Sequence, residues 1–336
     1  MYVFYASSNK YVPFLGVSIQ SLFETNADLQ TLEIFLCGDH ISEENQRRLK
    51  RLAEEYGRKI TFLDYSKLEE VAQQLKWRSQ GGSFSTYSKL IMDRYLPQYA
   101  NRVLYIDSSD TLVTGSLKPL ETLDMTGKAF AARVATAFYF KGETTSYDHS
   151  IARRKTYYNC GVFLVDINNW KQMHCFDIIQ KNSLEDPHFD IYDQTIINSY
   201  LPDNYGMTLP LKYNFDGFVC PSYLATRRLS LGNFYTREEI LDASKKPIII
   251  HWPGALHHPY VKGGLCRRKK EYMSYLSKSQ WKDDYEGKTI KEVMPKGETL
   301  KYMIIPFLEF YLPRTFVCLY HITSAIKKIT RKGGKK

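Results

Sequence analysis

The chain has 336 residues, of which 43% are hydrophobic and 14% are aromatic. This length allows one large domain or two smaller ones, and this composition excludes a disordered chain. The net charge of +10 comes from the end of the sequence, because residues 261–336 carry 18 Lys/Arg against 7 Asp/Glu. A basic tail on a nearly neutral body predicts attachment to an anionic surface and argues against a nucleic-acid partner.

The cysteine pattern and the first residues indicate in which cellular compartment the protein works. The six cysteines are scattered, with no CxxC pair, which predicts reduced thiols in a cytoplasmic protein and neither a zinc site nor a disulfide framework. Residues 1–5 have the pattern of a strand with no basic residue before it, so we expect no signal peptide.

Strands and helices alternate over the first 113 residues. This alternation with short connections is typical of a parallel sheet with helices on both faces. The sequence has neither a GxGxxG motif after the first strand nor a P-loop, which argues against a dinucleotide or P-loop site. We expect strands at 2–6, 32–37, 60–63 and 103–106, a turn at 7–9, and helices at 13–23, 41–56, 68–75 and 85–96.

The pattern becomes less regular after residue 127. Residues 138–155 are polar and irregular, and residues 252–260 form a loop rich in aromatic residues and histidine. We expect one catalytic domain over 1–262 and a separate extension over 263–336. Within the domain, strands are predicted at 129–134, 159–166 and 247–251, and helices at 170–180 and 190–200.

Two carboxylates follow the apolar strand predicted at 103–106. Asp107 and Asp110 would lie at the carboxyl edge of the sheet, where open α/β proteins bind their ligands. Carboxylates there are placed to hold a divalent cation, which in turn holds phosphate oxygens. The alternative is an ordinary turn at the end of a strand, in which Asp and Ser side chains bond to the backbone.

Six short motifs follow one another along residues 1–262. They are 5–11 together with 18–22, 85–90, 104–110, 158–170, the pair Asp193-Gln194, and His251 with Gly254. In this order they resemble glycosyltransferase family 8. The resemblance implies the GT-A nucleotide-diphospho-sugar transferase fold: α/β and Rossmann-like, with a mixed, mainly parallel sheet flanked by helices. It also implies a retaining hexosyltransferase that uses a UDP-sugar, usually UDP-Gal or UDP-Glc, together with Mn²⁺.

The resemblance also implies roles for matching residues. Asp107, Asp110 and His251 would bind Mn²⁺ or Mg²⁺, and such mixed oxygen and imidazole ligands suit Mn²⁺ better than Ca²⁺. Gln194 would lie at the reactive face of the sugar, and Asp193 would bind sugar hydroxyls. Contacts to the nucleotide and sugar would come from Ala6, Ser8, Tyr11, Lys89, Asp107, Ser108, Asn159, Gly161, Gly254 and His258, with Lys89 and His258 reaching the phosphates.

Purely structural roles are the alternative for several of these side chains. His251 would then be a core histidine, and Lys89 a solvated lysine on a helix. The pair Asp193-Gln194 would serve only to cap a helix and offset its dipole.

The sequence departs from the family pattern at the carboxylates and in the first loop. Two residues, Ser108 and Ser109, separate the aspartates where the family has one, so both acids face one ion only if this segment bends. Ser8 and Lys10 stand where the family usually has Asp and Asn. The alternative function is therefore a degenerate scaffold of the same fold that binds a nucleotide or a glycan.

The extension 263–336 combines basic runs with an aromatic, apolar stretch at 302–326. Prolines and charges interrupt that stretch, which argues against a membrane-spanning helix. We expect an interfacial anchor on the anionic inner face of the cell membrane, and a glycan or lipid-linked glycan as acceptor in lipopolysaccharide or other cell-surface polysaccharide synthesis. The alternative is a helical subdomain packed on the body.

Overall fold

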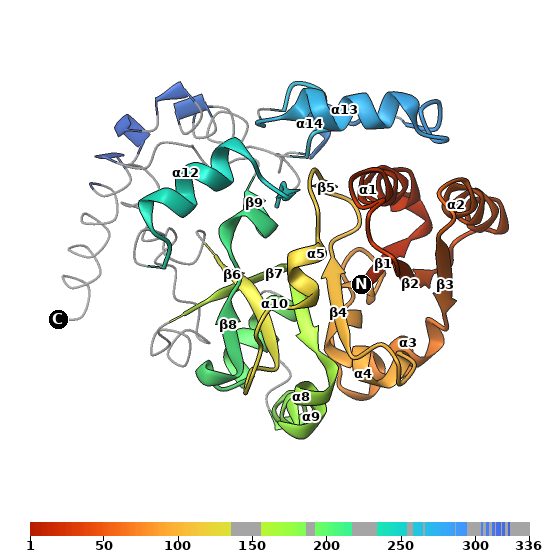
Figure 1. Ribbon diagram of the computed structural model, residues 1–336, viewed down its shortest axis with the longest axis vertical. Coiled ribbons are helices and arrows are strands. Elements are labelled where there is room, and N and C mark those ends of the chain that lie inside the picture. Colours follow the sequence, from red (N-terminus) through yellow and green to blue (C-terminus); the bar gives the residue numbers. More distant parts are fainter. Residues whose placement is uncertain are drawn as a thin grey trace.

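The computed structural model describes residues 1–135, 156–185, 192–216, 234–253, 258–264, 266–285 and 287–293, with separate positions between 304 and 322. Its centre is a seven-stranded sheet (Figure 1). Four of its six strand pairs are parallel, so the sheet is mixed and mainly parallel, as predicted. The strand order is β3 (Lys59–Leu63), β2 (Glu33–Asp39), β1 (Tyr2–Ser8), β4 (Arg102–Ile106), β7 (Tyr158–Asp166), β6 (Phe130–Val134) and β8 (Gly206–Thr208).

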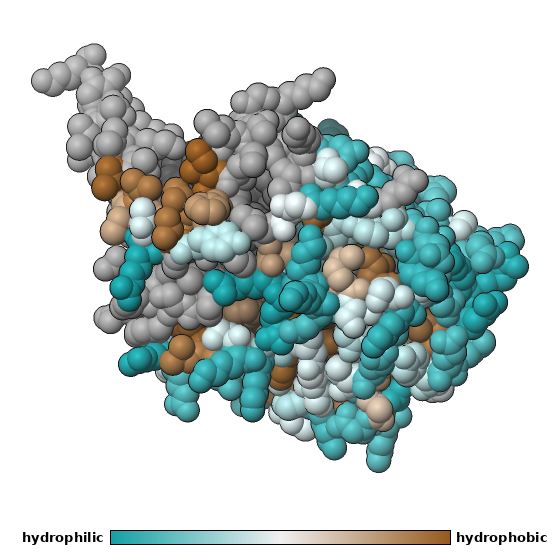
Figure 2. Space-filling view, turned by 90° about the horizontal axis from the view of Figure 1, so that it is seen from above, coloured by the Kyte–Doolittle hydropathy of each residue, from teal (hydrophilic) through white to brown (hydrophobic). Residues whose placement is uncertain are grey.

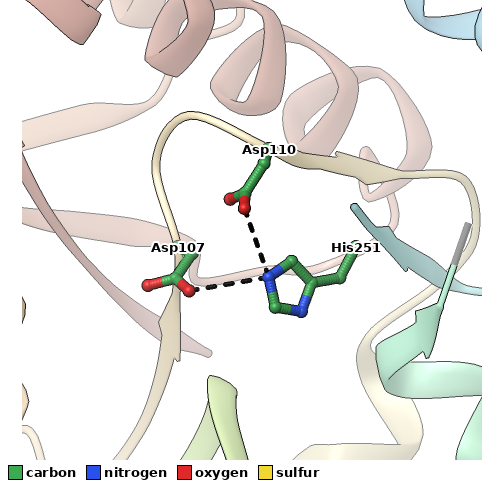
Figure 3. A group of neighbouring side chains, drawn as sticks. All are labelled: Asp107, Asp110 and His251. Atoms are coloured by element: carbon green, nitrogen blue, oxygen red, sulfur yellow. Dashed lines mark ion pairs between the residues drawn. The ribbon is translucent and has the colours of Figure 1, made fainter. Parts of the chain in front are cut away.

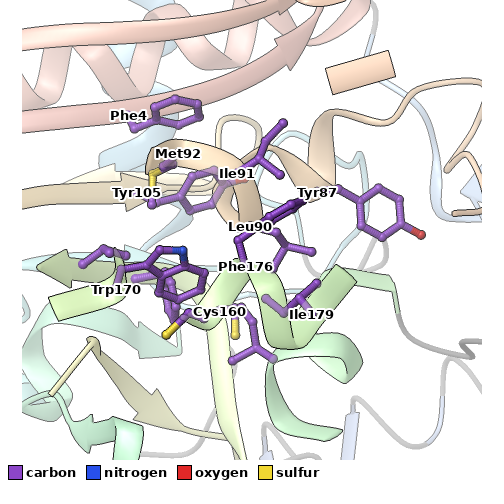
Figure 4. Close-up of a cluster of buried hydrophobic side chains, with 14 of the residues drawn as sticks. Phe4, Tyr87, Leu90, Ile91, Met92, Tyr105, Cys160, Trp170, Phe176 and Ile179 are labelled. Carbon is purple, nitrogen blue, oxygen red and sulfur yellow. The ribbon is translucent and has the colours of Figure 1, made fainter. Parts of the chain in front are cut away.

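Helices cover both faces of this sheet. Alternate residues of a strand point to opposite faces, so Val3 packs with α1 (Val12–Thr25) and α2 (Glu43–Glu55), whereas Phe4 packs in the opposite layer. Figure 4 shows that second layer. Its helices are α3 (Ser66–Gln74), the 3-10 helix η2 (Ser85–Ile91), α4 (Met92–Tyr95), α8 (Ile167–Gln172), α9 (Cys175–Glu185) and α10 (Tyr192–Tyr200).

A second, three-stranded sheet joins distant parts of the chain. It consists of β5 (Thr111–Val113), β10 (Ile249–His251) and β9 (Phe215–Asp216). β10 runs antiparallel to β5, with His251 opposite Thr111, and parallel to β9. Thr111, which directly follows Asp110, is therefore held opposite His251 by strand pairing.

Three predicted elements differ in detail. β1 continues through Ser8, and the 3-10 helix η1 (Asn9–Tyr11) replaces the predicted turn. The helix predicted at 170–180 is divided into α8 and α9, because His174 has a left-handed backbone with φ 54° that ends the first helix. The helix predicted at 85–96 begins as η2 and becomes α-helical only at Met92. The irregular segment 138–155 lies outside the described residues.

The first part of the extension packs on the body. Tyr272 and Leu276 of α13 (Lys269–Lys278) are buried together with Val17 and Trp252. The ring of Trp281 lies against α1 at Gly16, where a Cβ atom would come within 2.2 Å of it. Residues 269–281 thus follow the packed alternative. No helix in the described part of the chain has the length and apolarity needed to span a membrane.

The remaining helices of the described residues are α5 (Lys118–Glu121), the 3-10 helices η3 (Asp203–Tyr205) and η4 (Leu211–Asn214), α12 (Arg237–Lys245) and α14 (Ile290–Val293).

Candidate active site

A cleft of about 490 Å³ lies where several strands end. The ends of β1 and β4, the start of the antiparallel β7, the first turn of α10 and the end of β10 all contribute to it. Gly254 is outside the described residues. Every other predicted site residue lines this cleft: Ala6, Ser8, Tyr11, Lys89, Asp107, Ser108, Asp110, Asn159, Gly161, Asp193, Gln194, His251 and His258.

The two aspartates face the same point because the chain bends between them. The backbone bends at 108–110, and the Thr111 hydroxyl donates to the Asp107 carbonyl at 2.7 Å. The Asp107 N–H donates to the Gly161 carbonyl at 2.8 Å, which ties the bend to β7. The bend required by the two-residue spacing is therefore present.

His251 completes a group of three side chains (Figure 3). Its Nε2 lies 3.6 Å from Asp107 Oδ2 and 3.4 Å from Asp110 Oδ2. One donor atom from each residue lies within 4.8 Å of the others. His251 is buried, at 2% exposure, yet its ring faces two carboxylates, so the interpretation as an ordinary core histidine does not describe it.

These residues fit a divalent cation. They offer two carboxylates and one imidazole, a donor set that suits Mn²⁺ or Mg²⁺ through oxygen and Mn²⁺ also through nitrogen. Among the described residues, the buried Oδ1 atom of Asp110 has no hydrogen-bond partner, and a buried carboxylate oxygen left unpaired is costly. A cation at this point would satisfy it.

Burial and neighbouring charges shift the pKa values of these three residues in different directions. Burial raises the pKa of Asp107. Burial also acts to raise the pKa of Asp110, but the neighbouring His251 and His258 outweigh it and hold that pKa well below its ordinary value. Burial alone would lower the pKa of His251, whereas Asp110 and Asp107 raise it overall. In the protein without a cation, the two carboxylates therefore favour the protonated form of this imidazole.

The side chain of Gln194, on α10, is hydrogen-bonded to the start of β7. Its Oε1 accepts from the Cys160 N–H at 3.4 Å and from Asn159 Nδ2 at 3.3 Å. Its Nε2 donates to the Tyr157 hydroxyl at 3.4 Å. These bonds run to another element of the fold, so helix capping does not account for Gln194.

Lys89 is buried at 2% exposure, so the alternative of a solvated helix lysine is wrong. Its Nζ lies 2.6 Å from Asp193 Oδ2 and donates to the Cys160 carbonyl at 3.1 Å. A second, longer ion pair of 3.7 Å joins it to Asp107. The Thr86 hydroxyl also donates to Asp193, at 2.7 Å. The predicted contact of Lys89 with phosphate stays a prediction, because its ammonium is already paired with Asp193.

His258 lies beside the acids. Its Nε2 is 3.6 Å from Asp110 Oδ2, and its Nδ1 is 2.6 Å from the Tyr260 hydroxyl. This places an imidazole next to the candidate cation site, and its contact with phosphate stays a prediction. Residues from the start of the chain also line the cleft. They are Ala6 and Ser8 at the end of β1, and Tyr11, which is exposed.

Three contacts were not predicted from the sequence. Asn214 Oδ1 lies 3.0 Å from His251 Nδ1, the Tyr105 hydroxyl donates to Asp107 Oδ1 at 2.8 Å, and Thr86 bonds to Asp193. Tyr105 is recognisable in hindsight, because in a strand it faces the same side as the residue two positions on. No sequence pattern marks Asn214, which comes near His251 only through the β9–β10 pair.

Comparison with known proteins agrees with this fold. The sequence profile of glycosyl transferase family 8 matches residues 2–257. The chain therefore belongs to glycosyltransferase family 8, and the resemblance inferred from its motifs is confirmed. It is 29% identical over 177 residues to a putative glycosyltransferase of Haemophilus influenzae, covering 52% of this chain and 51% of that protein.

Further relatives include a lipopolysaccharide 1,3-galactosyltransferase of Salmonella typhimurium, 27% identical over 201 residues and matched over 55% of each chain. The chain thus spans about half the length of these curated relatives. Among solved structures, the galactosyltransferase LgtC in complex with donor and acceptor sugar analogues superposes with a TM-score of 0.67, at 19% identity, over 90% of this chain and all of that one. This likeness shows the GT-A fold.

Proposed function

We propose that this protein is a retaining, metal-dependent glycosyltransferase that moves a hexose, Gal or Glc, from a UDP-sugar to a glycan or lipid-linked acceptor. The observation that carries the proposal is the convergence of Asp107, Asp110 and His251 on one point of a strand-end cleft. The same cleft holds Gln194 and Asp193. Donor atoms for a cation and polar groups for a sugar therefore line one site.

Each group has a task in this reaction. The bond from the anomeric carbon to the β-phosphate oxygen breaks, an acceptor hydroxyl oxygen bonds to that carbon, and the hydroxyl proton passes to the departing phosphate. Bound Mn²⁺, or Mg²⁺, supplies neutralisation of the charge that develops on the diphosphate. Asp193, held by Lys89 and Thr86, accepts hydrogen bonds from sugar hydroxyls.

Gln194 favours attack from the front face. An amide is a poor nucleophile, so a covalent intermediate on this side chain is disfavoured, and the acceptor attacks beside the departing UDP. The anchored amide of Gln194 then orients the anomeric centre and stabilises its developing charge. Ala6, Ser8, Tyr11 and Ser108 would contact the nucleotide, Asn159 and Gly161 the sugar, and Lys89 and His258 the phosphates.

The test is release of UDP from a set of nucleotide sugars with Mn²⁺ present. Asp110→Ala should lower the rate at least about 100-fold, because several kcal/mol of charge stabilisation is lost. Gln194→Ala should lower it similarly while the protein stays folded. Full activity of Asp110→Ala would overturn the metal assignment.

A degenerate scaffold is the competing function, and the unusual Asp107–Asp110 spacing is its basis. Calorimetry with UDP, in the presence and absence of Mn²⁺, separates the two. A transferase binds UDP more tightly with Mn²⁺, whereas metal-independent binding without turnover of any donor favours the scaffold.

The acceptor and the location are part of the same proposal. The name of the Salmonella relative supports galactose as the sugar and lipopolysaccharide or a related glycan as the acceptor. Figure 2 shows apolar side chains gathered at one corner of the surface. Exposed apolar residues beyond the body include Phe307, Tyr311, Leu312 and Ile322. Together with the basic runs, they support peripheral attachment to the cytoplasmic face of an anionic membrane.

A further inference from the structure

Asn214 connects the candidate metal ligand His251 to the sugar side of the cleft. It is the last residue of η4, directly before β9, and its side chain is fully buried. Its Oδ1 lies 3.0 Å from His251 Nδ1, and its Nδ2 donates to Asn159 Oδ1 at 2.9 Å. Asn159 in turn donates to Gln194. Three amides thus form a chain from Gln194 to His251.

Two backbone N–H groups determine how these amides are oriented. The Gly161 N–H donates to Asn159 Oδ1 at 3.2 Å, and the Cys160 N–H donates to Gln194 Oε1 at 3.4 Å. A backbone N–H only donates, so the atoms facing these groups are the amide oxygens. The Nδ2 of Asn159 then faces Gln194 Oε1, as a donor should.

The orientation of Asn214 follows from that of Asn159. Because Asn159 presents its oxygen, the facing atom of Asn214 is the NH₂ group, and the Asn214 oxygen faces His251. An amide oxygen only accepts, so Nδ1 of His251 carries a proton and donates it. In the neutral ring, Nε2 is then the unprotonated atom, and it is Nε2 that faces Asp107 and Asp110.

We propose that Asn214 is a positioning residue that holds His251 in the Nδ1–H tautomer, so that the Nε2 lone pair is directed at the divalent cation. The inference rests on the proposed metal site for its purpose, although the tautomer itself follows from the protein alone. Hydrogen bonds of this kind orient metal-binding histidines and raise their basicity. The chain through Asn159 also ties the orientation of the ligand to that of Gln194.

The first test reads the tautomer directly. Protein labelled with ¹⁵N-histidine is studied without metal at a pH high enough to deprotonate His251, and the His251→Gln variant identifies the His251 signals. Wild-type protein should show a protonated Nδ1 and an unprotonated Nε2. Asn214→Ala should shift the ring toward a mixture of tautomers. Asn214→Asp, which keeps an acceptor, should restore the Nδ1–H form.

The second test measures Mn²⁺ affinity by calorimetry. Asn214→Ala should weaken it about 10- to 100-fold, the usual cost of removing a partner of a histidine ligand. Asn26→Ala is the matched control, since Asn26 is also fully buried but bonds to Leu22 and Leu117. It should lower stability and leave both the tautomer and the affinity unchanged.

The inference is overturned if wild-type His251 carries its proton on Nε2, whatever the stability of the variants. It is also overturned if folded Asn214→Ala keeps the wild-type tautomer and affinity. Wild-type protein that shows the Nδ1–H tautomer but binds no Mn²⁺ would instead contradict the proposed function, so the two failures are distinguishable.

Discussion

Gly161 allows β7 to pass directly behind the candidate metal ligands. A Cβ atom at this position would lie 2.2 Å from His251 Cε1 and 2.7 Å from Asp107 Oδ2. Both distances are far below van der Waals contact, so glycine is needed for space and not for backbone conformation. The grouping of Asp107 and His251 thus depends on a residue that binds no ion itself.

Gly161→Ala should therefore separate the ligands. We expect Mn²⁺ affinity and UDP release to fall at least about tenfold, with a loss in stability of about 1–3 kcal/mol for the overpacked position. Calorimetry and urea unfolding measure the two effects. Gly115→Ala is the control, because the atoms nearest to its Cβ would belong to Ile248, at 3.2 Å or more. Unchanged affinity in Gly161→Ala would contradict this account of the site.

The pH dependence of metal binding should follow His251. Its pKa is raised by Asp110 and Asp107 despite burial, and the cation can bind Nε2 only after the proton leaves. Affinity should be constant above that raised pKa and fall by up to about tenfold per pH unit below it. Asp110, whose pKa is lowered, stays ionised at these pH values, whereas Asp107, whose pKa is raised, adds to the loss of affinity at the acidic end. Affinity that is independent of pH between 5.5 and 8.5 would show that His251 is not a ligand.

At the scale of elements, the small sheet of β5, β10 and β9 assembles the site. β4 and β5 are consecutive, so the Asp107–Asp110 bend lies between strands of two different sheets. The Trp252 N–H donates to the Asp110 carbonyl at 2.8 Å and extends the β5–β10 pairing into the bend. The position of His251 is therefore set by backbone pairing.

The packing of Trp281 on α1 makes a prediction at the same scale. Trp281 is 1% exposed, and its indole N–H donates to Asn45 of α2 at 2.9 Å. Trp281→Ala should lower the free energy of unfolding by about 3–5 kcal/mol, as measured by urea denaturation. Leu184→Ala, at a residue 57% exposed, should cost little. A loss below about 1 kcal/mol for Trp281→Ala would show that this stretch does not stabilise the body.

At the scale of the whole molecule, charge is divided between body and tail. The packed residues 269–281 hold the start of the extension on the body, while basic runs continue to Lys336. The division between residues 262 and 263 stays a prediction. Side chains from both sides of it, such as Trp252 and Tyr272, are buried in one cluster.

Binding to anionic vesicles should depend on salt and on the end of the chain. The chain of residues 1–336 should co-sediment with phosphatidylglycerol vesicles at low salt, and less so at high salt because the basic residues are screened. Deleting 300–336 should abolish most of this binding. It should not change the rate of sugar transfer to a soluble acceptor, measured as UDP release. If the undeleted chain stays in the supernatant with these vesicles at low salt, membrane attachment is refuted.

Local sequence patterns were enough to predict the layered α/β architecture and the two aspartates of the candidate site. Hydrophobic periodicity and the position of acids after a strand are local properties, so the strand at 103–106 and Asp107 and Asp110 were predictable without the fold. The motif series also identified His251 and Gln194 as site residues. The contacts of Asn214 with His251 and of Lys89 with Asp193 are visible only in the folded chain. Those pairs join residues 37 and 104 positions apart, and which of them meet depends on long-range strand pairing and helix packing, which no local pattern records.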